Sequence, residues 1–248
     1  MKRTLSFLLC AALLPAAALA ENKPAHWSYE GATGPQNWAR LEQDFSTCKL
    51  GHNQSPIDIR KTSKAKLPAL EFAYSPSPLK ILDNGHTIQV NYAAGSSVTI
   101  DGKRYDLLQF HFHKPSEEKI NGRSYPMVAH LVHKNAEGKL AVVAVLFQKG
   151  AENPLVQTLW DALPKEKGEA QEIAGVNIDI GKLLPATQGY YNFAGSLTTP
   201  PCSEEVNWFV LKTPVDMSDA QLKRFAHVYK HNARPVQPLN GRTVQESL

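Results

Sequence analysis

Short runs of alternating apolar and polar residues, separated by turn residues, dominate the middle of the chain. The runs are HTIQVNY (86–92), SVTIDG (97–102), LLQFHFH (107–113), MVAHLVH (127–133), LAVVAVLF (140–147) and VNWFVLK (206–212). Alternation with a period of two predicts β-strands, and the NGH, DGK, NGR and AEGK turns between them predict antiparallel hairpins. The run 140–147 is apolar on both faces, which predicts a central strand.

Helical periodicity is confined to two segments. Residues 153–163 form one candidate helix, closed by Pro164, and residues 218–231 form another, with Ser218 as its N-cap. No repeat, low-complexity tract or linker divides the chain. We therefore predict a single, mainly β domain with a few peripheral helices.

The first twenty residues have the pattern of a secretory signal peptide. Lys2 and Arg3 precede an apolar stretch that ends in Ala-Leu-Ala at 18–20. A membrane anchor is the alternative, but the stretch is shorter than the roughly 20 apolar residues that span a bilayer. A lipid-modified Cys10 is a second alternative. We predict a mature chain of residues 21–248 that has no membrane span.

Charge and cysteine content limit the function further. Loss of Lys2 and Arg3 lowers the net charge from +4 to +2, which argues against nucleic acid as the main partner. Cys48 and Cys202 then remain as an even pair in an exported protein, which favours a disulfide over two buried free thiols.

Histidines in two of the predicted strands are the strongest candidates for chemistry. His111 and His113 share one strand face with Gln109, roughly 7 Å apart. A hairpin through NGR (121–123) would bring His130 beside them, whereas His133 would lie on the opposite face as a hydrogen-bonded core residue. Three protein ligands and an open position are what a catalytic zinc requires.

His227 and His231 are a weaker candidate pair. They lie four residues apart on the predicted last helix, opposite its apolar stripe, and Val228 stands where a zinc-protease helix would carry glutamate. We interpret them as residues of a solvated face.

At this point the sequence resembles the α-class carbonic anhydrases of the bacterial, exported type. The resemblance covers nearly all of 21–248. Seven motifs occur in the family's order, namely HWSYEGATGPQNW (26–38), NQSPIDI (53–59), NGHTIQVNY (84–92), QFHFHKPSE (109–117), AHLVH (129–133), GSLTTPPC (195–202) and RPVQPLNGR (234–242). It implies one domain around a large twisted, mostly antiparallel sheet of about ten strands.

The resemblance also implies a role for each matching residue. His111, His113 and His130 match the three zinc ligands, and Gln109 matches the residue that orients the first of them. Glu117 and Thr198 match the pair that orients zinc-bound hydroxide, and His86 matches the proton shuttle. The remaining matches are the polar residues of the proton and solvent path (Tyr29, Asn84 and Thr199) and the apolar wall that holds CO2 (Val132, Val142, Leu197 and Trp208).

The implied activity is zinc-dependent, reversible hydration of CO2 to bicarbonate and a proton in the periplasm, with secretion beyond the periplasm as the alternative location. Sulfonamide and anion inhibition at zinc, and a monomeric or dimeric state, are also implied. Two alternatives are a catalytically weak binding module that keeps the fold, and a zinc esterase that uses the same site. The binding modules related to this family usually lack a zinc histidine, whereas all three are present here.

One position departs from the family. The residue two before His130 is usually a glutamate that accepts a hydrogen bond from that histidine, but here it is Val128. Loss of such a partner typically costs about 10–100-fold in metal affinity or activity. Either a water or another side chain replaces it, or this enzyme holds zinc less tightly than its relatives. We predict that Val128→Glu slows zinc loss to a chelator.

Overall fold

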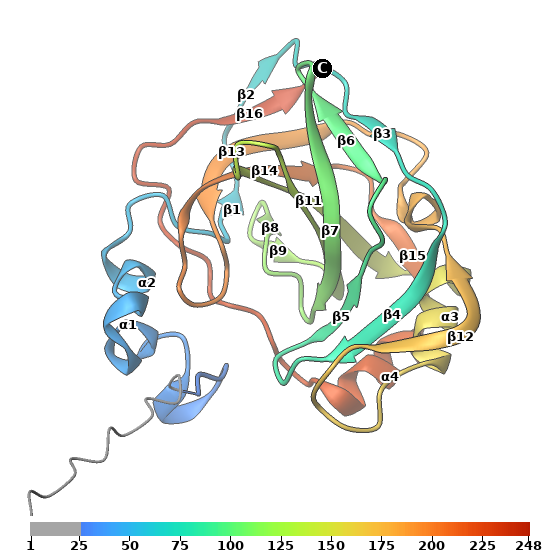
Figure 1. Ribbon diagram of the computed structural model, residues 1–248. Coiled ribbons are helices and arrows are strands. Elements are labelled where there is room, and N and C mark those ends of the chain that lie inside the picture. The colour runs from blue at the N-terminus through green and yellow to red at the C-terminus, as the bar shows by residue number, and fades with distance from the viewer. Residues whose placement is uncertain (1–25) are drawn as a thin grey trace, which may run out of the picture.

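A 13-stranded twisted sheet forms the body of the molecule in a computed structural model that describes residues 26–248 (Figure 1). The predicted signal peptide and Cys10 lie outside the described residues. Neighbouring strands along the main path are β12 (Gln171–Ile178), β4 (Ser77–Asp83), β5 (Ile88–Asn91), β7 (Lys103–His113), β10 (Met127–Lys134), β11 (Leu140–Lys149), β14 (Glu204–Leu211), β13 (Tyr190–Ser196), β16 (Val244–Ser247) and β2 (Thr62–Ala65).

Three further strands extend this sheet away from the main path. They are β3 (Glu71–Ala73), β6 (Ser97–Ile100) and β15 (Val215–Met217). A small second sheet contains β1 (Asp58–Ile59), β8 (Lys119–Ile120) and β9 (Arg123–Ser124). Most pairs are antiparallel, but β11 pairs in parallel with β14 and β15, β16 with β2, and β1 with β8. The predicted fold class is confirmed.

The helices are short and lie outside the sheet. They are α1 (Trp38–Leu41), α2 (Thr47–Leu50), α3 (Pro154–Asp161) and α4 (Asp219–Val228), with 3-10 turns at Gly31–Thr33, Gln43–Phe45 and Ile180–Leu183. Both predicted helices are present. A capping box between Ser218 and Gln221 begins α4, which ends at Val228 and not at 231. No helix in residues 26–248 is long and apolar enough to cross a membrane.

Strand alternation divides the apolar side chains between the two faces of the sheet. Phe110, Phe112 and Leu131 belong to a cluster on one face, which α3 and α4 cover; we call it the Phe112 cluster. The other face carries the Trp208 cluster, whose buried members are Ile57, Ile59, Val128, Val132, Val142, Ala144, Leu146, Phe193, Val206, Trp208, Val210 and Val244. Burial of one such large side chain contributes about 1.5–3 kcal/mol.

Strand β11 is the central strand that its apolar sequence predicted. Seven consecutive residues, 141–147, are buried, and alternate members belong to the Phe112 and Trp208 clusters. Strands β10 and β14 flank it. A rigid, double-faced sheet therefore supports β10 and β7, the two strands that carry the candidate ligands.

Candidate metal centre

The three candidate histidines meet on the face of the sheet that carries the Trp208 cluster. Strands β7 and β10 pair antiparallel with His130 directly opposite His111, as the hairpin interpretation predicted. One ring nitrogen from each of His111, His113 and His130 lies within 4.8 Å of the others. Within residues 26–248, this is the one group of three or more potential metal ligands found.

Each of these imidazoles has its other nitrogen hydrogen-bonded to an acceptor. Nδ1 of His111 lies 2.8 Å from Oε1 of Gln109, and Nδ1 of His113 lies 2.7 Å from the backbone oxygen of Asn232. Nε2 of His130 lies 3.0 Å from Oε1 of Glu118. These contacts place the hydrogen of each ring on the nitrogen that faces its acceptor. Nε2 of His111, Nε2 of His113 and Nδ1 of His130 keep their lone pairs and face the centre.

The free nitrogens have the properties that a zinc ion needs. His113 Nε2 is buried and has no hydrogen-bond partner among the described residues. Burial lowers the pKa of His111 to about 3 and holds that of His113 well below its usual value, so both are neutral donors at neutral pH. Burial lowers the pKa of His130, but the neighbouring Glu118 and Glu117 carboxylates outweigh that effect and raise it overall. A metal ion would displace the proton from Nδ1 of His130, and the three imidazole nitrogens would then fit Zn²⁺.

Glu117 lies beside the histidines, but it does not occupy their donor nitrogens. Its Oε1 accepts a hydrogen bond from the backbone N–H of Arg234 at 2.7 Å. Its Oε2 lies 3.5 Å from His113 Nε2 and 3.8 Å from His130 Nδ1. Burial raises the pKa of Glu117 to about 7, against smaller lowering effects that include a hydrogen bond with Thr198. The predicted Glu117–Thr198 pair is thus adjacent in space.

The four residues of the predicted apolar wall also lie at the centre. Val132, Val142 and Trp208 belong to the Trp208 cluster, and Leu197 packs against it. The Trp208 ring contacts His130 edge-on, with ring centroids 4.9 Å apart. An apolar surface therefore adjoins the donor nitrogens.

The residues predicted for the proton and solvent path, Tyr29, Asn84 and Thr199, lie in three different segments around the histidines. The Tyr29 hydroxyl is buried, and burial followed by the charge of Glu117 raises its pKa. Asn84 donates to Gln89 at 3.2 Å, and Gln89 donates to Asn91 at 2.8 Å. Gln89 and Asn91 lie opposite His111 and Gln109 in the sheet, so this polar row ends beside the ligands. Thr199 lies in the loop after β13, where its backbone oxygen accepts from Cys202 N at 2.8 Å.

The His86 ring is stacked on the ring of Trp27. The two rings are 3.6 Å apart between centroids with an interplanar angle of 7°, and the His26 ring lies 5.7 Å from that of His86. Burial, followed by the neighbouring His26, lowers the pKa of His86 to about 4. In this position the imidazole is neutral at neutral pH.

Glu118, Asn232 and Arg234 are site residues that the sequence interpretation missed. The backbone oxygen of Asn232 and the backbone N–H of Arg234 carry no side-chain signature, so no residue pattern reveals them. Glu118 directly follows Glu117, and this adjacency of two acids is the signal that could have found it. Val128 itself is fully buried in the Trp208 cluster.

Two other features predicted from the sequence have clear positions. His133 lies on the Phe112 face with Nε2 2.7 Å from the Tyr74 hydroxyl, as predicted for a core histidine. His227 is exposed with Nδ1 near the backbone oxygen of Lys223, and His231 lies beyond the end of α4. The pair is therefore not on one helix face, which corrects that part of the interpretation.

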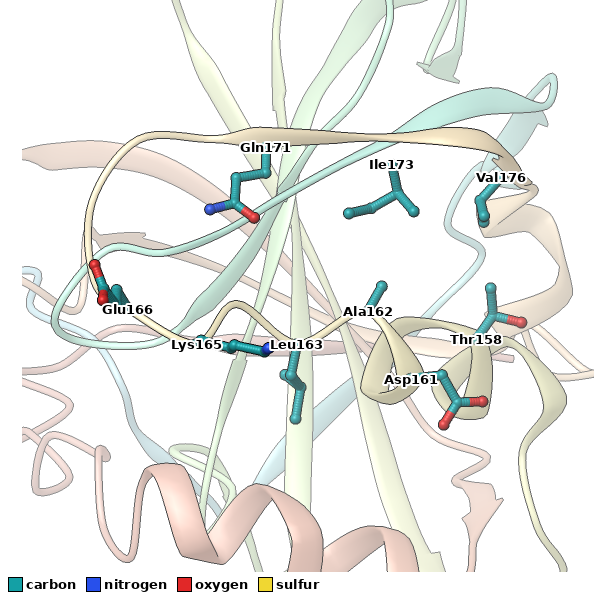
Figure 2. A pocket seen from close by; sticks show the side chains of 9 residues that line it. All are labelled: Thr158, Asp161, Ala162, Leu163, Lys165, Glu166, Gln171, Ile173 and Val176. Atoms are coloured by element: carbon teal, nitrogen blue, oxygen red, sulfur yellow. The ribbon is translucent and has the colours of Figure 1, made fainter.

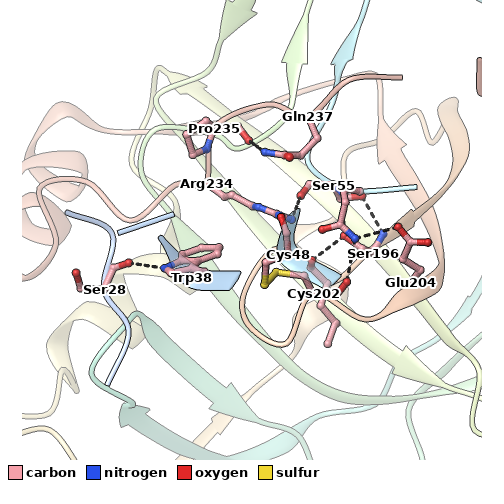
Figure 3. The surroundings of a disulfide bond; sticks show 12 residues. Ser28, Trp38, Cys48, Ser55, Ser196, Cys202, Glu204, Arg234, Pro235 and Gln237 are labelled. Atoms are coloured by element: carbon pink, nitrogen blue, oxygen red, sulfur yellow. Dashed lines mark hydrogen bonds between the residues drawn. A yellow bond between two sulfur atoms is a disulfide. The ribbon is translucent and has the colours of Figure 1, made fainter. Parts of the chain in front are cut away.

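The Cys48–Cys202 disulfide is present and ties α2 to the loop between β13 and β14 (Figure 3). Arg234 lies beside it and donates to the backbone oxygens of Cys48 and Ser55 at 2.8 and 2.7 Å. The same loop carries Thr198 and Thr199. The disulfide therefore anchors the segment that faces Glu117.

A groove of about 690 Å³ lies elsewhere, between α3 and β12 (Figure 2). Ile173 and Val176 of β12 lie across the groove from Thr158 of α3 and from Ala162, which follows the helix. None of the candidate ligands lines it. The chemistry that the histidines define belongs to the other face of the sheet.

Three imidazoles that direct one nitrogen each to a common point, beside the buried Glu117 carboxyl, define a site of the zinc-enzyme type on a large twisted sheet. The family model for the eukaryotic-type carbonic anhydrase matches residues 33–248. Carbonic anhydrases of Klebsiella pneumoniae and Pectobacterium carotovorum are 46% and 44% identical, over 96% and 98% of this chain and 96% and 99% of theirs. The α-carbonic anhydrase of Thermovibrio ammonificans, solved with the inhibitor sulfanilamide, superposes with a TM-score of 0.86 at 46% identity, covering 89% of this chain and 99% of that one.

The chain therefore belongs to the α-carbonic anhydrase family. It is a zinc enzyme of CO2 hydration, as the resemblance of its motifs implied.

Proposed function

We propose that His111, His113 and His130 hold the zinc at which this enzyme reversibly hydrates CO2. One observation carries the assignment: each imidazole has one nitrogen hydrogen-bonded to an acceptor and directs the other to a common centre. When bound, zinc lowers the pKa of a water molecule to about 7, the value established for carbonic anhydrase itself, and so supplies hydroxide at neutral pH.

Glu117 and Thr198 orient the nucleophile in this proposal. The backbone N–H of Arg234 fixes the Glu117 carboxyl, which then accepts the hydrogen of the Thr198 hydroxyl. A cation among the histidines favours the ionised carboxylate, and ionised Glu117 can only accept. The Thr198 oxygen is then left to accept a hydrogen bond from the nucleophile, which directs the nucleophile's lone pair toward the carbon of CO2.

The apolar wall holds the substrate next to the nucleophile. CO2 carries no charge and no hydrogen-bond donor, so Val132, Val142, Leu197 and Trp208 can bind it without polar groups that would need pairing. Bicarbonate is charged, and this surface offers it no partner. We infer that the wall favours entry of CO2 and release of the product.

His86 carries the released proton to the solvent in this proposal, with Tyr29, Asn84 and Thr199 along the path. A carrier needs a pKa near the working pH. The stacked ring, with its pKa of about 4, does not meet this requirement. In this proposal His86 takes up the proton from a position away from Trp27, because an exposed imidazole has a pKa of about 6.5.

Export and inhibition complete the proposal. Residues 1–20 act as a signal peptide that sends residues 21–248, the catalytic domain, to the periplasm. The centre also binds sulfonamides and anions, which is supported by the sulfanilamide complex of the Thermovibrio relative. The enzyme is a monomer or a dimer.

The test combines zinc content, stopped-flow CO2 hydration and one isosteric variant. Residues 21–248 should hold about one zinc per chain and hydrate CO2. Thr198→Val keeps the shape but removes the hydroxyl, and loss of such an oriented hydrogen bond should lower the rate of hydration by about 10²-fold with zinc content unchanged. Thr187→Val makes the same change at an exposed position and serves as the control.

Two outcomes would contradict different parts of the proposal. Full hydration activity in Thr198→Val would remove the role assigned to the hydroxyl. A zinc-replete wild-type protein without hydration would contradict the assignment of the catalytic centre.

A further inference from the structure

The hydrogen-bond partner of His130 comes from an unexpected part of the chain. His130 Nε2 lies 3.0 Å from Glu118 Oε1, and both side chains are buried, with relative exposures of 1% and 0%. Val128, two residues before His130 on the same strand face, has no acceptor to offer. We propose that Glu118 is the positioning residue for His130. This glutamate, from the segment before β8, takes the place of the glutamate that the family usually carries on β10 at the position of Val128.

The local structure fixes Glu118 in this position. Ser116 Oγ donates to the backbone oxygen of Glu118 at 2.7 Å and accepts from the backbone N–H of Tyr125 at 2.9 Å. The next residue, Lys119, donates its backbone N–H to Ile57 at 3.2 Å. The backbone of Glu118 is therefore held on both sides, and its Oε1 atom is directed at the ring of His130.

This contact selects the form of His130 that can bind metal. Because Nε2 carries the hydrogen donated to Glu118, Nδ1 keeps its lone pair and faces the other two histidines. A carboxylate also makes the imidazole a stronger donor than an amide acceptor would. The inference rests on the proposed function, because it assumes that His130 is a zinc ligand.

The cost of burying Glu118 argues for function and against a role in folding alone. Its Oε2 is buried and has no hydrogen-bond partner among the described residues. Glu117 lies in the same buried cluster, and the charge of Glu118 is one cause of its raised pKa. A buried carboxylate with one oxygen unpaired is unfavourable for the metal-free fold. A cation at the three histidines would offset that repulsion.

The same arrangement changes the outcome expected for Val128→Glu. Val128 lies opposite His113 in the sheet and is fully buried. A glutamate there would place a third carboxylate beside Glu117 and Glu118. Because Glu118 already pairs with His130, we expect the single substitution to destabilise the protein and not to slow zinc loss. Combined with Glu118→Ala, the same substitution should restore the missing acceptor.

The experiment measures the rate at which zinc is lost to a chelator, together with the stability of each metal-free protein. Glu118→Ala should accelerate zinc loss by about 10–100-fold, and Glu118→Gln, which keeps an acceptor without its charge, by less. Val128→Glu in the Glu118→Ala background should reverse most of that increase. Glu137→Ala, in the exposed turn between β10 and β11, is the matched control.

The outcomes separate the possible roles. The metal-free Glu118→Gln protein should be at least as stable as the wild type, whereas a purely structural role predicts a loss of stability that parallels the faster zinc loss. An unchanged rate of zinc loss in both Glu118 variants would overturn the inference. If Glu118→Ala does not fold, the rate measured for Glu118→Gln decides the question alone. A wild-type protein that binds no zinc would instead contradict the proposed function.

Discussion

At the residue scale, the stacking of His86 on Trp27 determines when that histidine can take up a proton. Burial is the largest cause of its low pKa, and the Trp27 ring covers one face at a centroid distance of 3.6 Å. Trp27→Ala should therefore raise the pKa of His86 from about 4 toward 6.5, as measured by NMR titration of the imidazole. Trp27→Phe keeps an aromatic face and should change the pKa less. An unchanged pKa in Trp27→Ala would show that stacking is not the cause.

The residue scale also shows what could be predicted from sequence and what could not. Alternation in 107–113 and 127–133 is sufficient to place three histidines on one face, because strand geometry fixes the side of every second residue. That rule does not reach Glu117 and Glu118, which lie in bends between β7 and β8. Outside a strand, two adjacent side chains can point to the same side. The family motif identified Glu117, but only the three-dimensional structure places Glu118 against His130.

At the scale of elements, the central strands were predictable and the edges were not. The runs that became β5, β6, β7, β10, β11 and β14 have clear alternation or continuous apolar character. Strands such as β1, β8 and β9 have two residues each, too few to show a period. The parallel pairing of β11 with β14 joins segments more than sixty residues apart, and no local pattern specifies it.

The disulfide acts on one of these elements, the loop between β13 and β14. Cys48 and Cys202 are separated by 154 positions, and the chain-entropy model gives about 5 kcal/mol for a loop of that size. Cys48→Ser combined with Cys202→Ser should lower the free energy of unfolding by up to this amount in urea. Hydration should also slow with zinc content unchanged, because the loop carries Thr198 whereas the ligands lie on β7 and β10.

Reduction of the wild-type protein provides the control. Dithiothreitol should reproduce both effects in the wild type and change nothing in the double variant, which has no other cysteine in residues 21–248. Equal unfolding free energies with and without the disulfide would contradict the prediction.

At the scale of the whole molecule, both faces of the sheet bury histidines. His133, on the Phe112 face, affects the stability of the protein and takes no part in the proposed chemistry. His133 is fully buried with its Nε2 bonded to Tyr74. Burial lowers its pKa to about 4, although the backbone of Ala141 and Leu131 acts in the opposite direction. The folded protein therefore keeps His133 neutral over a range of pH in which the unfolded chain protonates it.

The sign of the effect follows from proton binding. Above pH 6.5 His133 is neutral in both states, so it causes no pH dependence. Between pH 6.5 and about 4 the unfolded chain binds more protons, and the free energy of unfolding falls as the pH falls. The slope from this residue reaches about 1.4 kcal/mol per pH unit, and the total is on the order of 3 kcal/mol.

His133→Gln keeps a hydrogen-bonding side chain for Tyr74 but cannot titrate. Its free energy of unfolding, measured in urea on the metal-free protein between pH 7 and 4, should therefore decrease less steeply with falling pH than that of the wild type. The difference in slope should reach about 1.4 kcal/mol per pH unit, which corresponds to one proton. Use of the metal-free form removes the contribution of zinc release, and the remaining titrating groups are common to both proteins. His227→Gln, on the exposed face of α4, should retain the steep profile. Identical slopes in His133→Gln and the wild type would contradict the assignment of this pH dependence to His133.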